Sequence, residues 1–402
     1  MKEGWIESTI GDCFFSIKNG ANIKQVKGAT GIPITRIETL SNGIFNRDRL
    51  GYANIGDVTK YESYILNDGD ILVSHINSMK YIGRAVLYKK KGNETIIHGM
   101  NLLSIVSDKT KIIPDFARYY FQTESYKKDI QSISNQSVNQ ASFNVTSFKK
   151  ISFKYPSLSE QTRIVEKLDA AFEKIDRLKE NAEKGLQAVK DLWEATLTKE
   201  LSHKEGWKET SIGEICEIVR GKRFVRADIV ENGVPCIHYG DMYTHYGMSA
   251  TKAKGCVSPE LAKKLRFANK NDVVVVAAGE NKYDIGVGMV WLGSEPAVVH
   301  DACFILKHSQ NPMFLSYYFR STPYHQYLKD EVNEGKICSF LTKPLAAAKI
   351  SLPPLAVQNE IVKKLDDVRD RVEKLIANYK ETIDSYAPLK QAILRKAFSG
   401  EL

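Results

Sequence analysis

The chain has 402 residues, which is too long for one ordinary domain and suits two or three. Hydrophobic residues make up 43% and charged residues 26%, which is normal globular usage and excludes disordered, collagen-like and disulfide-framework proteins. The net charge of +9 favours a polyanionic partner, with nucleic acid and an anionic membrane surface both open.

The start of the chain and its cysteines both favour a cytoplasmic protein. Residues 1–10 lack a basic stretch followed by an apolar core, and no run of about 18 apolar residues occurs anywhere. The cysteines form no C-x-x-C pair and no short Cys/His cluster, so we expect reduced thiols and no metal site. We therefore predict a cytoplasmic chain without a membrane-spanning segment.

The first half of the chain divides by pattern into a mixed globular segment and a helical tail. Short β-branched runs such as Asp70–Ser74 are bounded by Gly, Asn and Pro, as strands and turns are. Phe116–Ile130 is predicted to be one helix, which Pro114-Asp115 opens. In the tail, apolar residues recur at alternating spacings of four and three over Ile164–Ala182, the pattern of a coiled-coil seam.

The second half repeats this order. Val273–Val276 is an expected strand, Phe314–Lys329 an expected helix, and the apolar seam returns over Ile361–Tyr379. Each tail of roughly 40 residues would form a helix on the order of 60 Å long. Because Pro388 lacks a backbone N–H, we expect the second helix to kink or restart near Ala387.

The two halves also match residue by residue. The matches keep a constant offset through the globular segments, and a small deletion in the second copy shortens the offset in the tails. A repeat of roughly 200 residues is a duplicated domain pair and not a solenoid. The matched stretches include Glu3-Gly4-Trp5 with Glu205-Gly206-Trp207, Ile96-Ile97-His98 with Val298-Val299-His300, and Gln161–Asp169 with Gln358–Asp366.

These patterns predict a mixed α/β (α+β) fold of two tandem globular domains, each followed by a long helix. The predicted limits are 1–155 and 204–352 for the globular domains and 156–203 and 353–402 for the helices. The helical segments carry almost no net charge, so the excess of basic residues lies on the globular segments. A polyanion would therefore bind the globular domains.

The motifs of common enzymes are missing. Gly221-Lys222 and Gly335-Lys336 lack the flanking residues of a P-loop, and Gly286-Val287-Gly288 lacks the third glycine of a dinucleotide fingerprint. Leu352–Leu355 contains two prolines but neither the polar lead residue nor the aromatic that an amino-methyltransferase uses on a flipped base. The matched His98 and His300 fit buried imidazoles at strand ends better than a shared titratable site.

Basic and amide-rich loops are the candidates for binding nucleic acid. Arg220–Arg226 packs four cations around a glycine and an aromatic residue, a composition suited to phosphate contacts and to reading guanine. Its counterpart Lys18–Lys24 is less basic, so the copies would not read the same sequence. The candidate DNA-binding residues are Lys18, Lys24, Asn77, Lys80, Arg84, Gln136 and Asn139 in the first copy, and Arg220, Lys222, Arg223, Arg226, Asn281, Lys282 and Lys336 in the second.

A family resemblance rests on two motifs and on their duplicated order. The junction Ile350–Leu355 leads into Gln358 and Ile361–Asp366, and Leu389–Leu402 closes the chain. The first copy carries looser versions in Tyr155–Leu158 and Leu192–Ser202. With these motifs, the chain resembles the DNA-specificity (S) subunit of Type I restriction-modification systems over essentially its whole length.

This resemblance implies two target-recognition domains, each of which reads one half of an asymmetric bipartite site on double-stranded DNA. The two helices would pair as an antiparallel coiled coil that serves as a spacer and as the dock for two modification (methyltransferase) subunits. Up to two restriction (translocase and nuclease) subunits would join outside. The chain itself would be non-catalytic and without cofactor, because S-adenosylmethionine, ATP and Mg would act in the partner subunits.

Two other functions remain open from the sequence alone. A stand-alone enzyme would turn over S-adenosylmethionine or cut DNA unaided. A structural adaptor would use its helices for partner helices and its basic domains for RNA or acidic protein, and would show no preference for any duplex sequence.

Overall fold

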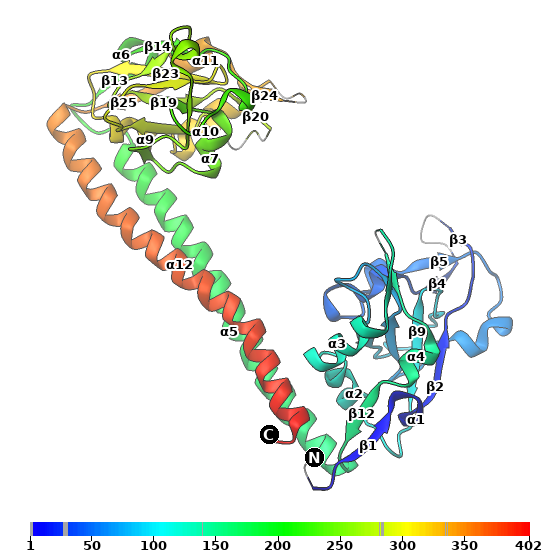
Figure 1. Cartoon of the computed structure of the whole chain (residues 1–402). Coiled ribbons are helices and arrows are strands. Elements are labelled where there is room, and N and C mark those ends of the chain that lie inside the picture. Colours follow the sequence, from blue (N-terminus) through cyan, green and yellow to red (C-terminus); the bar gives the residue numbers. More distant parts are fainter. Residues whose placement is uncertain are drawn as a thin grey trace. The chain divides into compact units, whose positions relative to one another are not determined.

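The structure is a computed structural model that describes residues 3–26, 31–138, 140–280, 282, 285–333, 335 and 337–402, apart from the side chains of Val26 and Asn42. It divides into two compact units, unit 1 (Met1–Ala182 with Glu381–Leu402) and unit 2 (Glu183–Lys380). Each unit holds a globular part and a segment of both long helices, α5 (Leu158–Leu201) and α12 (Leu355–Ser399) (Figure 1). The unit boundaries fall inside the helices, so the four predicted segment limits stay a prediction.

The globular part of unit 1 is built on a four-stranded antiparallel sheet in the order β2-β9-β6-β8. All four residues of the central strand β6 are buried, as expected for a strand covered on both faces. Smaller sheets join β3-β5-β4, β10-β11-β7 and β1-β12. The strands are β1 (Ile6–Thr9), β2 (Phe14–Asn19), β3 (Gln25–Val26), β4 (Ile32–Ile34), β5 (Gly51–Ala53), β6 (Ile71–Ser74), β7 (Ile76–Asn77), β8 (Ala85–Leu87), β9 (Leu102–Ser107), β10 (Asn135–Gln136), β11 (Ala141–Ser142) and β12 (Ser152–Tyr155). The helices are α1 (Ile10–Cys13), α2 (Pro114–Tyr120), α3 (Glu124–Ile133) and α4 (Val145–Lys149), with 3-10 helices at Ile37–Gly43, Arg47–Arg49 and Thr59–Tyr64.

Unit 2 has a five-stranded sheet in the order β14-β23-β19-β21-β16 and a four-stranded sheet in the order β17-β15-β22-β18. In the second sheet β15 and β22 run parallel, which places their carboxyl ends side by side. The pairs β13-β25 and β20-β24 complete the unit. The strands are β13 (Lys208–Ser211), β14 (Cys216–Arg220), β15 (Val234–Ile237), β16 (Ser249–Ala250), β17 (Gly255–Val257), β18 (Phe267–Ala268), β19 (Val273–Val276), β20 (Ala278–Gly279), β21 (Gly288–Trp291), β22 (Ala297–Val299), β23 (Cys303–His308), β24 (Cys338–Ser339) and β25 (Lys349–Leu352). The helices are α6 (Ile212–Ile215), α7 (Tyr239–Thr244), α8 (Pro259–Ala262), α9 (Pro312–Tyr318), α10 (Thr322–Lys329) and α11 (Thr342–Ala347), with a 3-10 helix at Arg226–Asp228.

The two globular parts share one order of elements, as the sequence repeat predicted. Each opens with a strand, one helical turn and a second strand, namely β1-α1-β2 and β13-α6-β14. In each, the first strand pairs antiparallel with the strand that precedes the long helix, β12 or β25. The predicted mixed α/β fold of two globular domains, each followed by a long helix, is therefore confirmed.

The prediction of one helix over 116–130 and one over 314–329 is wrong, because each region forms two helices. Thr123 lies between α2 and α3, where its hydroxyl donates to the carbonyl of Tyr120 (2.8 Å) and accepts from the N–H of Tyr126 (3.2 Å). Ser321 lies between α9 and α10, and its hydroxyl donates to the carbonyl of Tyr318 (2.8 Å). The Thr123 hydroxyl therefore ends α2 and caps α3, whereas the Ser321 hydroxyl bonds only the end of α9.

The predicted restart of the second helix near Ala387 is also wrong. Helix α12 continues through Pro388 to Ser399. Pro388 and Asp384 are both exposed, so the carbonyl of Asp384, which loses its helical N–H partner, can bond water.

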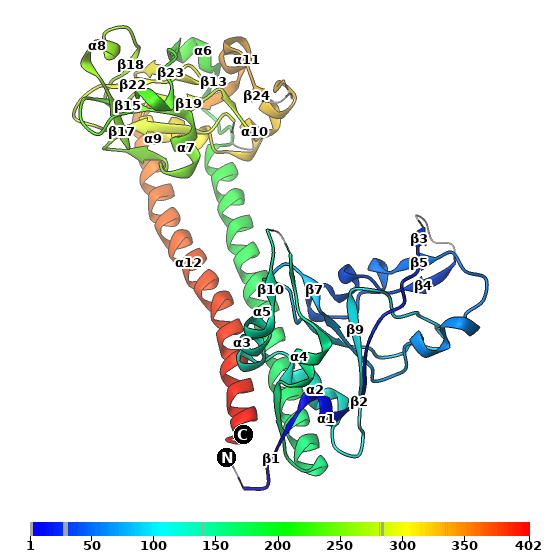
Figure 2. The same ribbon diagram turned by 45° about the vertical axis from the view of Figure 1, so that its right-hand side comes forward.

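The long helices pair antiparallel, as predicted, and this is visible within each unit (Figure 2). In unit 1, Lys390 of α12 lies 2.5 Å from the carboxylate of Asp176 of α5. In unit 2, Lys364 of α12 lies 2.5 Å from the carboxylate of Glu200 of α5. The apolar seam residues that are buried include Ile164, Leu168, Ile175, Ile361, Leu365 and Val372.

A buried glutamine at the start of each long helix ties the helix to its globular part. Gln358 is fully buried, and its Oε1 accepts from the N–H of Asn311 (2.9 Å). Its Nε2 donates to the carbonyl of Pro353 and to the side chain of Gln310, both at 2.9 Å. Gln161 repeats the arrangement in unit 1, with Oε1 on the N–H of Ile113.

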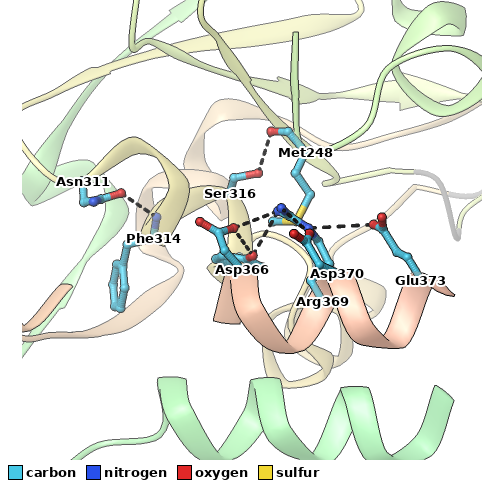
Figure 3. A network of polar contacts seen from close by, with 9 residues as sticks. Met248, Asn311, Phe314, Ser316, Asp366, Arg369, Asp370 and Glu373 are labelled. Atoms are coloured by element: carbon cyan, nitrogen blue, oxygen red, sulfur yellow. Dashed lines mark hydrogen bonds and ion pairs between the residues drawn. The ribbon is translucent and has the colours of Figure 1, made fainter. Parts of the chain in front are cut away.

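A tyrosine–aspartate bond adds a second tie. In unit 2 the hydroxyl of Tyr317 donates to Asp366 (2.6 Å), and the guanidinium of Arg369 contacts both at 3.1 and 2.9 Å (Figure 3). Burial of the ring raises the pKa of Tyr317, and the hydrogen bond to the Asp366 carboxylate raises it further. The phenol therefore stays protonated. In unit 1, Tyr119 donates to Asp169 in the same way.

We expect Gln358→Leu to destabilise unit 2 by about 3 kcal/mol, because it leaves a buried N–H and a buried carbonyl without partners. Three of the tryptophans, Trp193, Trp207 and Trp291, lie in unit 2, so urea unfolding followed by tryptophan fluorescence reports mainly on that unit.

The matched control is Gln187→Leu on the exposed face of α5, where the amide contacts only Asp191 one turn away. Equal unfolding free energies for the two variants would contradict the role assigned to Gln358.

Candidate nucleic-acid interface

The basic segment of unit 2 alternates exposed cations with a buried aromatic anchor. It follows β14, and Phe224 in its middle is only 2% exposed. Arg223 and Arg226 on either side are exposed. The side chain of Phe224 packs among apolar residues that include Cys236 and Val298. The anchor therefore holds both arginines at a defined place on the surface.

Arg223 and Arg226 line a pocket of about 710 Å³ in unit 2. Its aromatic wall consists of closely packed rings: the ring centroids of His238 and His300 are 4.7 Å apart, and those of Tyr239 and His300 are 5.2 Å apart. The other lining residues are Phe224, Val225, Ala278, Gly279, Glu280, Asp301, Ala302 and Ile337.

The two histidines meet because of sheet topology. His238 directly follows β15 and His300 directly follows β22, and these strands run parallel as neighbours. Residues at the carboxyl ends of adjacent parallel strands share one edge of the sheet, where ligands commonly bind. The repeat between the two halves identified His300 but not His238 or Tyr239, because no sequence pattern predicts that β15 and β22 pair in parallel.

Both imidazoles are neutral at physiological pH. Burial, reinforced by His300 and Arg226, lowers the pKa of His238 to about 4. Burial lowers the pKa of His300 as well, against the opposing charge of Asp301, whose carboxylate lies 3.1 Å from Nδ1. Each Nδ1 accepts a backbone N–H, from Gly240 for His238 (3.3 Å) and from Ala302 for His300 (3.0 Å). The hydrogen therefore lies on Nε2 in both rings.

The remaining cations of this segment have other positions. Arg220 donates from Nε to the carbonyl of Asp301 (2.8 Å), and its guanidinium lies 5.8 Å from the ring centre of Phe304. Arg220 therefore ties the segment to the backbone at Asp301 and does not line the pocket. Lys222 is exposed and is not among the residues that line the pocket.

The equivalent region of unit 1 is built differently. His98, the counterpart of His300, is completely buried, and its Nε2 contacts the carbonyl of Leu102 (2.8 Å). Burial lowers the pKa of His98 to about 4, so this imidazole is also neutral. Lys18 donates to the carbonyl of Ser63, whereas Lys24 is exposed.

The predicted amide-rich loops of unit 1 come together in one small sheet. In the sheet β10-β11-β7, Gln136 pairs with Ala141, which in turn pairs with Asn77. Unit 2 repeats this junction with β20 and β24. The sequence predicted these loops separately, and their pairing could not be read from it because each strand is only two residues long.

Two cations of unit 1 gather around one exposed aromatic ring. The guanidinium of Arg84 lies 4.5 Å and the ammonium of Lys80 5.3 Å from the ring centre of Tyr81. Arg84 also donates to the carbonyl of Leu40 (3.1 Å). Of the other candidates, Lys282 lines a second pocket of unit 2, whereas Asn139, Asn281 and Lys336 lie outside the described residues.

The chemistry of these surfaces is that of binding. Among the residues that the structure describes, no three His, Cys, Asp or Glu side chains come together as a metal site. The cysteines are free thiols, and burial raises the pKa of Cys216, Cys236 and Cys303 to or above about 12. Within the same described ranges, no helix is both long and apolar enough to cross a membrane.

Comparison with known proteins identifies the family of this chain. A family model described as a type I restriction modification DNA specificity domain matches residues 2–187 and 204–384. The chain is 29% identical over 419 residues to a Methanocaldococcus jannaschii protein named as the type I restriction enzyme MjaX specificity subunit. This match covers 100% of this chain and 94% of that protein. It is 22% identical over 427 residues to the type I restriction enzyme StySPI specificity subunit of Salmonella potsdam. That match covers 100% of this chain and 90% of the other protein.

Two solved structures share the fold at 19% sequence identity each. The match to the HsdS subunit from Thermoanaerobacter tengcongensis covers 100% of this chain and 98% of that chain, with a TM-score of 0.61. A chain from a study of complex assembly and conformational transition of the type I R-M system covers 100% and 99%, with a TM-score of 0.79. Since the family model covers both halves, the chain belongs to the type I restriction-modification DNA specificity family, whose members are non-catalytic subunits that direct target recognition.

Proposed function

We propose that this specificity subunit reads an asymmetric two-part site on double-stranded DNA, with one half-site for each unit. The observation that carries the proposal is that the two units present different exposed side chains. Unit 2 presents an aromatic pocket flanked by Arg223 and Arg226, whereas unit 1 buries the matching His98 and presents Lys80, Tyr81 and Arg84. Copies that differ at the contact surface would select different bases.

Exchange of residues 1–155 for the corresponding domain of another specificity subunit tests this division of labour. We expect one half of the recognised sequence to change and the other half to persist, because unit 2 keeps its own surface. Selection of bound duplexes from a random pool, or mapping of methylated sites in the assembled enzyme, gives the answer. A change in both halves would exclude independent reading by the two units.

In unit 2 we expect Arg223 to contact base edges at the mouth of the pocket. Arg223→Ala should cost about 1 to 3 kcal/mol of binding to the preferred site and relax selectivity at one position, as the loss of a bidentate contact to guanine does. Competition binding with single-base variants of the selected site measures both effects.

Lys222→Ala is the matched comparison, since Lys222 is exposed in the same segment but lies off the pocket. We expect it to weaken all duplexes equally, as loss of a phosphate contact would. Unchanged affinity and selectivity in Arg223→Ala would remove this segment from the interface.

We further propose that the helix pair docks two modification subunits, one at each unit, and that up to two restriction subunits join this core in the cytoplasm. Catalysis with S-adenosylmethionine, ATP and Mg would then belong to those partners. Exposed leucines at equivalent positions of the repeat support a duplicated partner. Leu178 and Leu375 are each 45% exposed, and Leu192 and Leu389 are 62% and 45% exposed. Each unit thus carries one such leucine from α5 and one from α12.

The double variant Leu178→Glu with Leu389→Glu alters only unit 1. We expect it to lower the number of modification subunits recovered with the chain from two to one, because charged side chains oppose apolar docking. The mass of the intact complex gives this number. Asn181→Glu, on the exposed face of the same helix, should keep two partners, and retention of two by the double variant would place the dock elsewhere.

A further inference from the structure

A second pocket of unit 2 holds an arginine without a counter-charge. The pocket has a volume of about 470 Å³ and lies between α10, the last turns of α5 and the loop that carries Lys282. Arg320 lines it and donates from Nη2 to the carbonyl of Gly247 (2.9 Å). Among the residues that the structure describes, its buried Nε has no hydrogen-bond partner and no carboxylate offsets the burial of its charge.

Two other half-buried arginines, one in each unit, have carboxylate partners. Arg118 in unit 1 lies 3.0 Å from Asp169 and 3.4 Å from Asp115. Arg369 in unit 2 lies 2.9 Å from Asp366 and also contacts two further carboxylates. Nearby carboxylates help to keep the pKa of both guanidinium groups above its usual value.

Arg320 shows the opposite shift. Burial lowers the pKa of Arg320 to about 10, the direction expected when desolvation is not offset by an anion. A half-buried charge without a partner is costly, and an incoming anion would remove that cost. The pocket is therefore prepared for a negatively charged group that the chain itself does not supply.

The other charged residues that line the pocket are mainly positive. Lys282 and Lys329 add two positive charges, whereas Glu194 is the one carboxylate among the lining residues and accepts from the hydroxyl of Thr322 (3.4 Å). His325 contributes no charge, because burial lowers its pKa and its Nε2 contacts the carbonyl of Phe319 (3.0 Å).

Comparison of the copies indicates which anion enters. In unit 1 the residues equivalent to Arg320 and Glu194 are Gln122 and Gln391, and Gln391 donates to the carbonyl of Gln122 (3.0 Å). This neutral pair has no excess positive charge. A partner subunit that docks equally on both units would need the same group in both. Lys282 also belongs to the loop after β20, which was predicted to contact DNA.

We propose that this pocket of unit 2 binds a phosphate of the DNA backbone through Arg320, with Lys282 and Lys329 beside it. The inference rests on the proposed DNA-reading function and adds to it a phosphate anchor at Arg320, where unit 1 has Gln122. Such a contact fixes the position of the domain on the duplex and carries no base information.

The test is the salt dependence of binding of the full-length chain to a mixed-sequence DNA duplex. Arg320→Gln copies the side chain that unit 1 has at this position. We expect about tenfold weaker binding at fixed salt and a slope of log affinity against log salt that is smaller by about one, as for one lost phosphate contact. The base preferences selected from a random pool should not change. Arg320→Lys should recover part of the affinity.

A stability control separates this role from a structural one. Arg369→Gln removes a guanidinium that three carboxylates surround, so it should lower the melting temperature, whereas Arg320→Gln should leave it unchanged or raise it. Wild-type affinity and salt slope in Arg320→Gln would overturn the proposal. So would intact DNA binding with loss of the modification subunit, which would assign the pocket to a carboxylate of that partner. Failure of the DNA-reading function itself would appear separately, as absence of sequence preference in the wild-type chain.

Discussion

The whole structure depends on the burial of two apolar helix faces that neither helix can bury alone. An isolated amphipathic helix of this length gains little from propensity and needs a packed face. The core of unit 1 accordingly contains Leu394 and Ala397 from the end of the chain, both almost fully buried, and Phe398 packs on Phe116 with ring centroids 5.0 Å apart. Unit 2 in turn needs Leu197 from α5. Each globular part is therefore completed by a helix that starts in the other half of the sequence.

Because the helices complete the cores, the bonds at their first turns determine how each globular part is held. Gln161 and Gln358 satisfy buried backbone groups, and Tyr119 and Tyr317 bind the aspartates two turns further along. These contacts are short in range and nearly the same in both copies. They leave the distant loops free to differ. A surface that selects bases can then change without loss of the scaffold.

The sequence predicted those features that depend on periodicity and repetition. The matched glutamines and aspartates, the two helical seams and the duplicated order are all visible in the residues. It failed where a single hydroxyl decides, because Thr123 and Ser321 end helices that their apolar pattern would have continued. It also failed for non-local pairing: His238 gains its position from the parallel neighbours β15 and β22, which are separated by six other strands in the chain. Base contacts remain proposals because they depend on a duplex that brings its own geometry.

The duplication allows roles to be separated by comparing the copies. Residues that match and are buried, such as Gln161 and Gln358, serve the fold. Residues that match and are exposed, such as Leu178 and Leu375, suit a partner that binds twice. Residues that differ and line a pocket, such as Arg320 against Gln122, suit a ligand that differs between the units. His98 and His300 show that identity alone is insufficient for this sorting, because the same residue is interior in unit 1 and lines the pocket in unit 2. Burial and identity must be compared together, because only their combination separates the shared scaffold from the two different recognition surfaces that we propose.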